Sequence, residues 1–148
     1  MQKSPADIEF NLLSDPRQLV IVCTAVRQFA QIHGLDEKSQ RQLELAVDEV
    51  CSNVICHAYK GNREKHYRVR CSIQNNQIIV EVVDHGIEFT LQDYPKPKLD
   101  CSLKERQSGG LGIHFVKKLM DELEYIKLPT GENCCRMKKT LNQQPTVS

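Results

Sequence analysis

Two polar residues have the types and the spacing needed for phosphate chemistry. Glu49 and Asn53 are four residues apart in a segment with helical periodicity, so we expect them on the same face of a helix. A carboxylate can accept the proton of an attacking hydroxyl group, and an amide oxygen can coordinate a hard cation such as Mg²⁺. Taken alone, the pair also fits a solvated polar helix surface.

A second candidate motif comes directly after an apolar strand. Asp84, His85 and Gly86 follow the sequence IIVEVV. A carboxylate at a strand end can accept a hydrogen bond from the exocyclic amine of a base, and glycine lets the backbone approach a ligand closely. Because Asp and Gly are also common turn residues, the motif by itself indicates either a base-binding site or a turn.

A third motif, Ser-Gly-Gly-Leu-Gly at residues 108–112, opens a predicted helix. Free N–H groups and the positive end of a helix dipole favour phosphate oxygens. Neither a P-loop nor a dinucleotide fingerprint fits, because no Gly-Lys-Ser/Thr follows and no strand runs into the glycines. A flexible hinge is the alternative interpretation of this segment.

The hydrophobic pattern indicates the elements that must position these motifs. Prolines, charges and weak periodicity between His85 and Gly109 predict a long loop. The order of strands and helices predicts an α+β two-layer sandwich, with helices on one face of a mixed, mostly antiparallel sheet. In chain order we expect a strand at 8–12, a helix at 17–33, a second helix from an N-cap at Asp36 through Tyr59, strands at 66–73 and 77–84 joined by Asn75-Asn76, a helix at 111–123, strands at 124–128 and 135–141, and a frayed tail at 142–148.

Length and composition are those of an ordinary globular protein. The 148 residues predict one domain, and 40% hydrophobic with 26% charged residues is a typical balance. We see no secretion signal and no membrane-spanning run, so we expect a cytoplasmic protein. A net charge of +1 gives no electrostatic footprint for nucleic acid.

The seven cysteines are odd in number, and we expect them to be reduced. A metal or redox site built from some of them and the histidines is a third possibility for function. No Cys-x-x-Cys spacing supports such a site. The cysteines that it would use are Cys51, Cys56, Cys134 and Cys135.

In this order and context, the three motifs resemble those of the GHKL ATPase superfamily, which includes gyrase and histidine kinases. Within it, the chain resembles the bacterial anti-sigma factor serine/threonine kinases of the sporulation and general-stress systems. The similarity covers nearly the whole chain, and ERQSGGLGIHFVKKLMDELEY is its most specific part. The resemblance implies a single histidine-kinase-like ATPase domain over residues 1–148.

The resemblance also implies roles for individual residues. Glu49 would be the general base, and Asn53 would hold the Mg²⁺ that bridges the phosphates of ATP. Asp84 would accept the adenine amine, and Gly86 would make room for the base. Residues 85–108 would form an ATP lid. The remaining implied nucleotide contacts are Arg106, Gly110, Leu111 and Gly112.

The implied function is an anti-sigma factor that phosphorylates a Ser or Thr of a STAS-type anti-anti-sigma protein and otherwise binds a sigma factor. The family also implies a homodimer, and from charge and hydrophobicity we expect no direct nucleic-acid or membrane contact. Two departures favour an alternative, a non-catalytic partner-switching adaptor. Glu88 stands where the family has a second glycine, although Phe89 matches an aromatic of some members, and the hairpin at 131–135 lacks the usual Thr beside the adenine. We interpret His57 as a packing or supporting residue.

Overall fold

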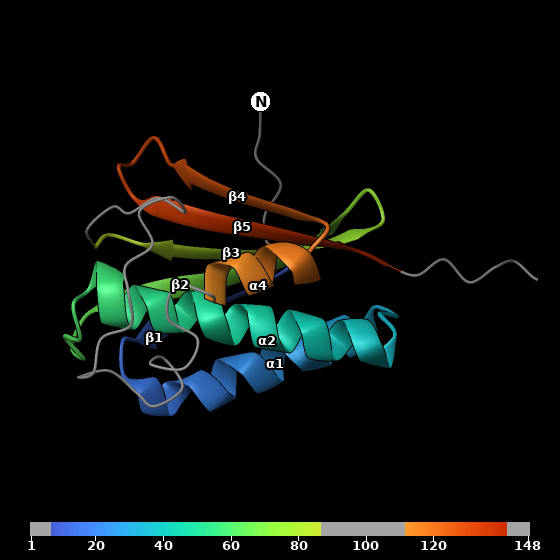
Figure 1. Ribbon diagram of the computed structural model, residues 1–148, viewed down its shortest axis with the longest axis horizontal. Helices are drawn as coiled ribbons and strands as arrows, with labels where there is room; N and C mark the ends of the chain where they lie inside the picture. The colour runs from blue at the N-terminus through green and yellow to red at the C-terminus, as the bar shows by residue number, and fades with distance from the viewer. Residues whose placement is uncertain (1–6, 87–111, 142–148) are drawn as a thin grey trace, which may run out of the picture.

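A computed structural model of the chain describes residues 7–86 and 112–141. Three helices, α1 (Leu19–Ile32), α2 (Glu37–Asn53) and α4 (Gly112–Leu119), cover one face of a five-stranded sheet (Figure 1). The predicted two-layer α+β architecture is therefore confirmed. All strand pairs in the described part of the chain are antiparallel, so the prediction of a mixed sheet is wrong there. The strands in sheet order are β1 (Ile8–Leu13), β2 (His66–Gln74), β3 (Gln77–Asp84), β5 (Asn133–Thr140) and β4 (Glu122–Lys127).

Turn and cap residues act where the sequence predicts. The two residues between β2 and β3, Asn75 and Asn76, have φ angles of 49° and 63°. Both angles lie in the left-handed region that a tight hairpin turn requires. Gly34, with a φ of 91°, follows α1, and the Leu35 N–H donates to the Ala30 carbonyl at 3.0 Å, which closes the helix.

The second helix begins and ends differently. Its Asp36 carboxylate accepts a hydrogen bond from the Ser39 N–H at 3.4 Å, so the predicted N-cap is confirmed. At the other end, α2 stops at Asn53 and one π-helical turn, Val54–Ala58, continues the chain. Such turns are rare, and they occur frequently at functional sites. The turn therefore draws attention to the residues at the end of α2.

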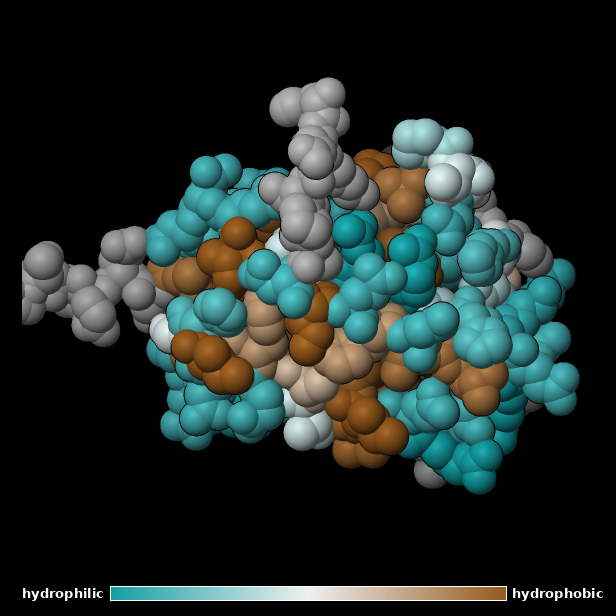
Figure 2. All heavy atoms as spheres, turned by 180° about the vertical axis from the view of Figure 1, so that it is seen from behind, coloured by the Kyte–Doolittle hydropathy of each residue, from teal (hydrophilic) through white to brown (hydrophobic). Residues whose placement is uncertain are grey.

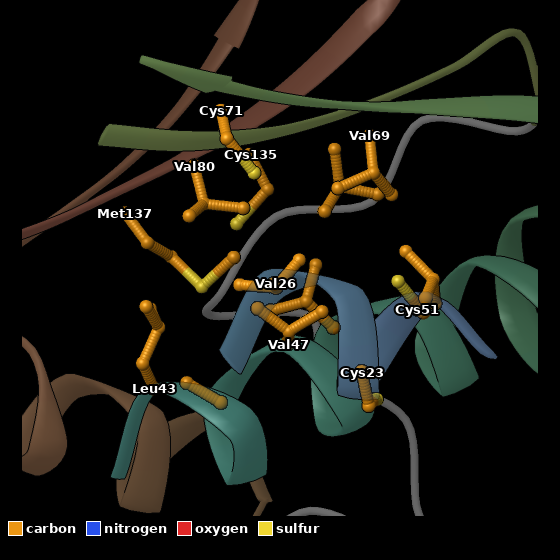
Figure 3. Close-up of a cluster of buried hydrophobic side chains, with 14 of the residues drawn as sticks. Cys23, Val26, Leu43, Val47, Cys51, Val69, Cys71, Val80, Cys135 and Met137 are labelled. Carbon is orange, nitrogen blue, oxygen red and sulfur yellow. The ribbon is translucent and has the colours of Figure 1, made fainter. Parts of the chain in front are cut away.

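The core lies between the helices and the sheet. Its side chains are between 0% and 8% exposed. Burying one Val or Leu side chain contributes about 1.5–3 kcal/mol, so this layer supplies most of the driving force for folding. Figure 3 shows Val69, Cys71, Val80, Cys135 and Met137 of the sheet above Cys23, Val26, Leu43, Val47 and Cys51 of the helices.

The opposite face of the sheet carries a row of alternating charges. The row crosses all five strands, and each member is the register partner of the next. Glu81, at its centre, lies 3.3 Å from the Arg70 guanidinium and 2.8 Å from the Arg136 guanidinium. Opposite charges on neighbouring strands stabilise the pairing. The complete row is Glu9, Arg70, Glu81, Arg136 and Glu124.

The last helix is shorter than the predicted helix at 111–123. It ends at Leu119 because the chain then joins the sheet. The Asp121 N–H donates to the Lys138 carbonyl at 2.9 Å, and the Asp121 carboxylate accepts from the Thr140 N–H at 2.6 Å. Pairing with the sheet therefore overrides the helical pattern at the end of the predicted helix, after Leu119.

Within residues 7–86 and 112–141, no helix is both long and apolar enough to span a bilayer. The surface seen from behind shows hydrophobic residues adjoining one another across the middle of this face, with hydrophilic residues around them (Figure 2). Exposed apolar surface is normal in globular proteins. Among the described residues, the large exposed apolar side chains are Ile8, Val20, Ile21, Ile32, Leu45 and Phe115.

Candidate functional site

Glu49 and Asn53 are buried, being 6% and 2% exposed. The alternative of a solvated polar surface is therefore wrong for this pair. Two neighbours on the same turns, Asp48 and Ser52, are also buried. Burying polar and ionisable groups at one helix end costs free energy unless they are hydrogen-bonded or paired, so this concentration indicates a functional site.

Gly112, the first residue of α4, lies directly against the Glu49 side chain. A Cβ atom at position 112 would be 2.1 Å from Glu49 Oε2 and 2.6 Å from its Cδ. Real Cβ atoms do not approach other atoms this closely, so a side chain at position 112 would force the Glu49 side chain to move. The glycine motif and the Glu-x-x-x-Asn motif thus meet, and the carboxylate sits at the positive end of a helix.

Asp84 lies at the end of β3 and is 1% exposed. Its Oδ1 accepts the Gly86 N–H at 2.8 Å and the Asn133 Nδ2 at 3.0 Å. Burial raises the pKa of the Asp84 carboxyl group, while these hydrogen bonds and electrostatic interactions with His85 and Lys127 lower it. The residue is therefore a carboxylate held in a polar niche inside the protein.

Gly86 packs against the π-helical turn that follows α2. A Cβ atom at position 86 would be 2.4 Å from the Ala58 carbonyl oxygen. Close packing of two backbones thus requires the glycine. The Tyr59 hydroxyl accepts the His85 N–H at 3.1 Å and holds the same segment. The expected role of Gly86 in making room for a base stays a prediction.

Two motifs therefore converge on the stretch between Glu49 and Ala58. Gly112 contacts its beginning, and Gly86 contacts its end. Asn53 lies between these two contacts, and His57 is 9% exposed in the π-helical turn. The structure thus brings together residues that are far apart in the sequence, as the predicted site requires.

The other predicted site residues lie outside the described part of the chain. Most of the predicted lid at 85–108 lies outside the described residues, and so does the tail at 142–148. The same holds for Glu88 and Phe89. The remaining predicted phosphate contacts outside the described residues are Arg106, Gly110 and Leu111.

Asn133 is the site residue that the sequence did not predict. It is the first residue of β5 and is 1% exposed. Its Nδ2 donates to Asp84 Oδ1 and, at 3.1 Å, to the Gly86 carbonyl. Its Oδ1 accepts from Lys127 Nζ at 3.1 Å. A polar residue directly before two cysteines of the core-facing strand was the available signal, but the register that pairs Asn133 with Asp84 is set by the fold.

Within the described residues, the cysteines and histidines do not form the alternative metal site. No group of three potential ligands is found there. Burial raises the pKa of the Cys71 thiol to about 12 and that of Cys51 well above its usual value, which disfavours reactive thiolates. Cys56 is disulfide-bonded, so the expectation of fully reduced cysteines is wrong for this residue. The free and buried cysteines are Cys23, Cys51, Cys71, Cys134 and Cys135.

Known proteins are similar to this chain in sequence and in fold. Residues 12–139 match the family model described as histidine kinase-like ATPase domain. The chain is 26% identical over 148 residues to the serine-protein kinase RsbW of Bacillus licheniformis, covering 97% of this chain and 91% of the relative. It is 28% identical over 106 residues to the anti-sigma F factor of Oceanobacillus iheyensis, covering 72% and 73%.

Among solved structures, the SiaB-SiaC complex from Pseudomonas aeruginosa matches with a TM-score of 0.62 and 11% identity, over 90% of this chain and 89% of that chain. At this identity, the match supports the fold alone. Sequence and structure comparisons agree with the residue-level resemblance. The chain belongs to the histidine kinase-like ATPase domain family, with the bacterial anti-sigma factor serine kinases among its relatives.

Proposed function

We propose that this protein binds ATP with Mg²⁺ and phosphorylates a Ser or Thr of a STAS-type anti-anti-sigma protein, thereby controlling a sigma factor by partner switching. The observation that carries this proposal is the contact between Glu49 and Gly112. It places a buried carboxylate at the start of the helix that would receive the phosphates. The relatives named as serine-protein kinases and anti-sigma factors support the choice of substrate.

The described residues fit the nucleotide and the metal. The start of α4 offers N–H groups that lack partners within the helix, and Gly112 has no side chain to block them. The Asn53 amide oxygen is the kind of hard ligand that Mg²⁺ takes. Asp84, held by the Gly86 N–H and the Asn133 amide, would accept the adenine amine.

The proposed chemistry needs little beyond alignment and charge neutralisation. ATP would supply the transferred phosphoryl group, and its Mg²⁺ would neutralise phosphate charge. Glu49 would accept the proton of the attacking Ser or Thr hydroxyl group, which typically accelerates a reaction by about 10²–10⁴-fold. The proposed contacts of Arg106, Gly110 and Leu111 with the phosphates rest on the family resemblance. So do the sigma-factor partner and the homodimer, while the single-domain organisation rests on both the resemblance and the chain length.

The alternative is an adaptor that switches partners without catalysis. Glu88 in place of a glycine and the missing Thr of the last hairpin are the observations that favour it. A kinase must bind Mg-ATP and turn it over, whereas an adaptor need not. Phosphate transfer to a STAS-type protein therefore separates the two functions.

The test is transfer of radiolabelled phosphate from ATP to a purified STAS-type protein. We expect Glu49→Gln to lower the transfer rate by roughly 10²-fold or more while ATP still binds. Glu37→Gln is the matched control, because Glu37 lies on the same helix, is exposed and pairs only weakly with Arg41 at 3.3 Å. Full transfer by Glu49→Gln would contradict the assigned base, and no transfer by the wild-type protein would favour the adaptor.

A further inference from the structure

The hydrogen bonds of Asn133 fix the orientation of its amide group. Its NH₂ group donates to two acceptors, Asp84 Oδ1 and the Gly86 carbonyl, and its oxygen accepts from the Lys127 ammonium group. Turning the amide around would place oxygen against oxygen at the first two contacts and a donor against a donor at the third. Three partners therefore require the same orientation.

The position of Asn133 in the sheet makes this arrangement rigid. Asn133 on β5 is the register partner of Asp84 on β3 and of Lys127 on β4. Directly opposed residues in antiparallel strands have Cβ atoms about 4.5–5.5 Å apart, which suits a direct side-chain hydrogen bond. Asp84 and Asn133 are each 1% exposed, so little water competes for these groups.

The two oxygens of the Asp84 carboxylate are used unequally. Within the described part of the chain, both hydrogen bonds to this carboxylate go to Oδ1, from the Gly86 N–H and from Asn133. Among the described residues none donates to Oδ2, so this oxygen can accept a further donor. Adenine presents an amine hydrogen at its exocyclic position, whereas guanine presents a carbonyl oxygen there, which an ionised carboxylate repels.

We propose that Asn133 is the positioning residue for base recognition, an inference that rests on the proposed function. Asn133 holds the Asp84 carboxylate by Oδ1, so that Oδ2 selects a base with an exocyclic amine. Asn133 thereby takes the place of the Thr that the sequence lacks in this hairpin. A hydroxyl group has one hydrogen to donate, while the Asn133 amide donates to Asp84 and to the Gly86 carbonyl at once.

The electrostatic surroundings agree with this role. Burial raises the pKa of Asp84, and the hydrogen bond from Asn133 is the foremost of the interactions that lower it. The Gly86 N–H, His85 and Lys127 act in the same direction. Asn133 thus helps to keep ionised the carboxylate that accepts the amine.

The test compares ATP with purine riboside triphosphate, which lacks only the exocyclic amine, by calorimetric titration in the presence of Mg²⁺. We expect wild-type protein to prefer ATP by roughly tenfold or more, the usual effect of a hydrogen bond to a charged group. Asn133→Ala should reduce this preference to less than about threefold. Asn11→Ala is the matched control, because Asn11 is an exposed asparagine on a strand, and it should keep the wild-type ratio of the affinities for ATP and purine riboside triphosphate.

The ratio of the two affinities separates positioning from a general structural effect, because loss of folding weakens both ligands equally. An unchanged ratio in Asn133→Ala, or an equal loss of affinity for both nucleotides, would overturn the inference but not the proposed function, which depends on ATP binding by the wild-type protein. If Asn133→Ala does not fold, Asn133→Thr is used, since it keeps one donor and should give an intermediate ratio. A wild-type protein that binds neither nucleotide would overturn the proposed function and this inference with it.

Discussion

Replacing Gly112 with alanine tests the contact on which the site depends. The new Cβ atom would lie 2.1 Å from Glu49 Oε2, 2.6 Å from Cδ and 2.9 Å from Cγ. Ordinary contacts begin near 3.4 Å, so the Glu49 side chain must move by roughly 1 Å. A displacement of this size in a catalytic group costs about 10²-fold in rate, and overpacking costs about 1–3 kcal/mol of stability.

Two opposing effects determine the change in stability. Alanine is favoured over glycine inside a helix by about 0.8–1.0 kcal/mol, although less at the first position. We therefore expect Gly112→Ala to lower the free energy of unfolding by about 0–2 kcal/mol in the wild-type background. In the Glu49→Ala background the clashing atoms are gone, and Gly112→Ala should become neutral or stabilising.

The assay is a double-mutant cycle measured by urea unfolding, with phosphate transfer recorded for the Gly112→Ala single variant. The cycle isolates the interaction between the two positions. A destabilisation that is equal with and without the Glu49 side chain would refute the contact. Rapid transfer by the Gly112→Ala variant would refute its importance for catalysis.

Three further predictions concern the surroundings of the site. Asp84→Asn should raise the melting temperature at pH 7 but abolish ATP binding. The pKa of Asp84 is raised from 3.8 in the folded state, so ionisation of this carboxyl group costs stability as pH rises from 3.8 through the folded-state pKa. The increase in melting temperature caused by Asp84→Asn should therefore become smaller as pH falls toward 4. Gly86→Ala should destabilise by about 1–3 kcal/mol in thermal unfolding, because its Cβ would be 2.4 Å from the Ala58 carbonyl oxygen, and a smaller loss would refute that packing. Glu81→Gln, which leaves two arginines without their shared carboxylate, should lower stability in urea by about 1–3 kcal/mol and leave phosphate transfer unchanged.

The sequence predicted the features that short segments determine. Asp36 caps a helix through a residue three positions away, and Asn75-Asn76 forms a turn through its own backbone preferences. The Glu49–Asn53 pair was recognised from its spacing. Its burial was not, because burial depends on how α4 packs against α2.

What the sequence could not predict depends on contacts between distant segments. Asn133 joins the site through strand register with Asp84, which lies 49 positions earlier in the chain. The early end of α4 at Leu119 follows from sheet pairing by Asp121, although the helical pattern continues past it. In each case a tertiary interaction decided between alternatives that local sequence leaves open.

The central claim is that Asp84 and the start of α4 form one ATP site beside Glu49. Calorimetric titration of the full chain with Mg-ATP, for the wild type and for the Asp84→Asn and Glu49→Gln variants, tests it most directly. The account predicts that the wild type and Glu49→Gln bind ATP and that Asp84→Asn does not. Equal binding by Asp84→Asn, or no binding by the wild type, would contradict it.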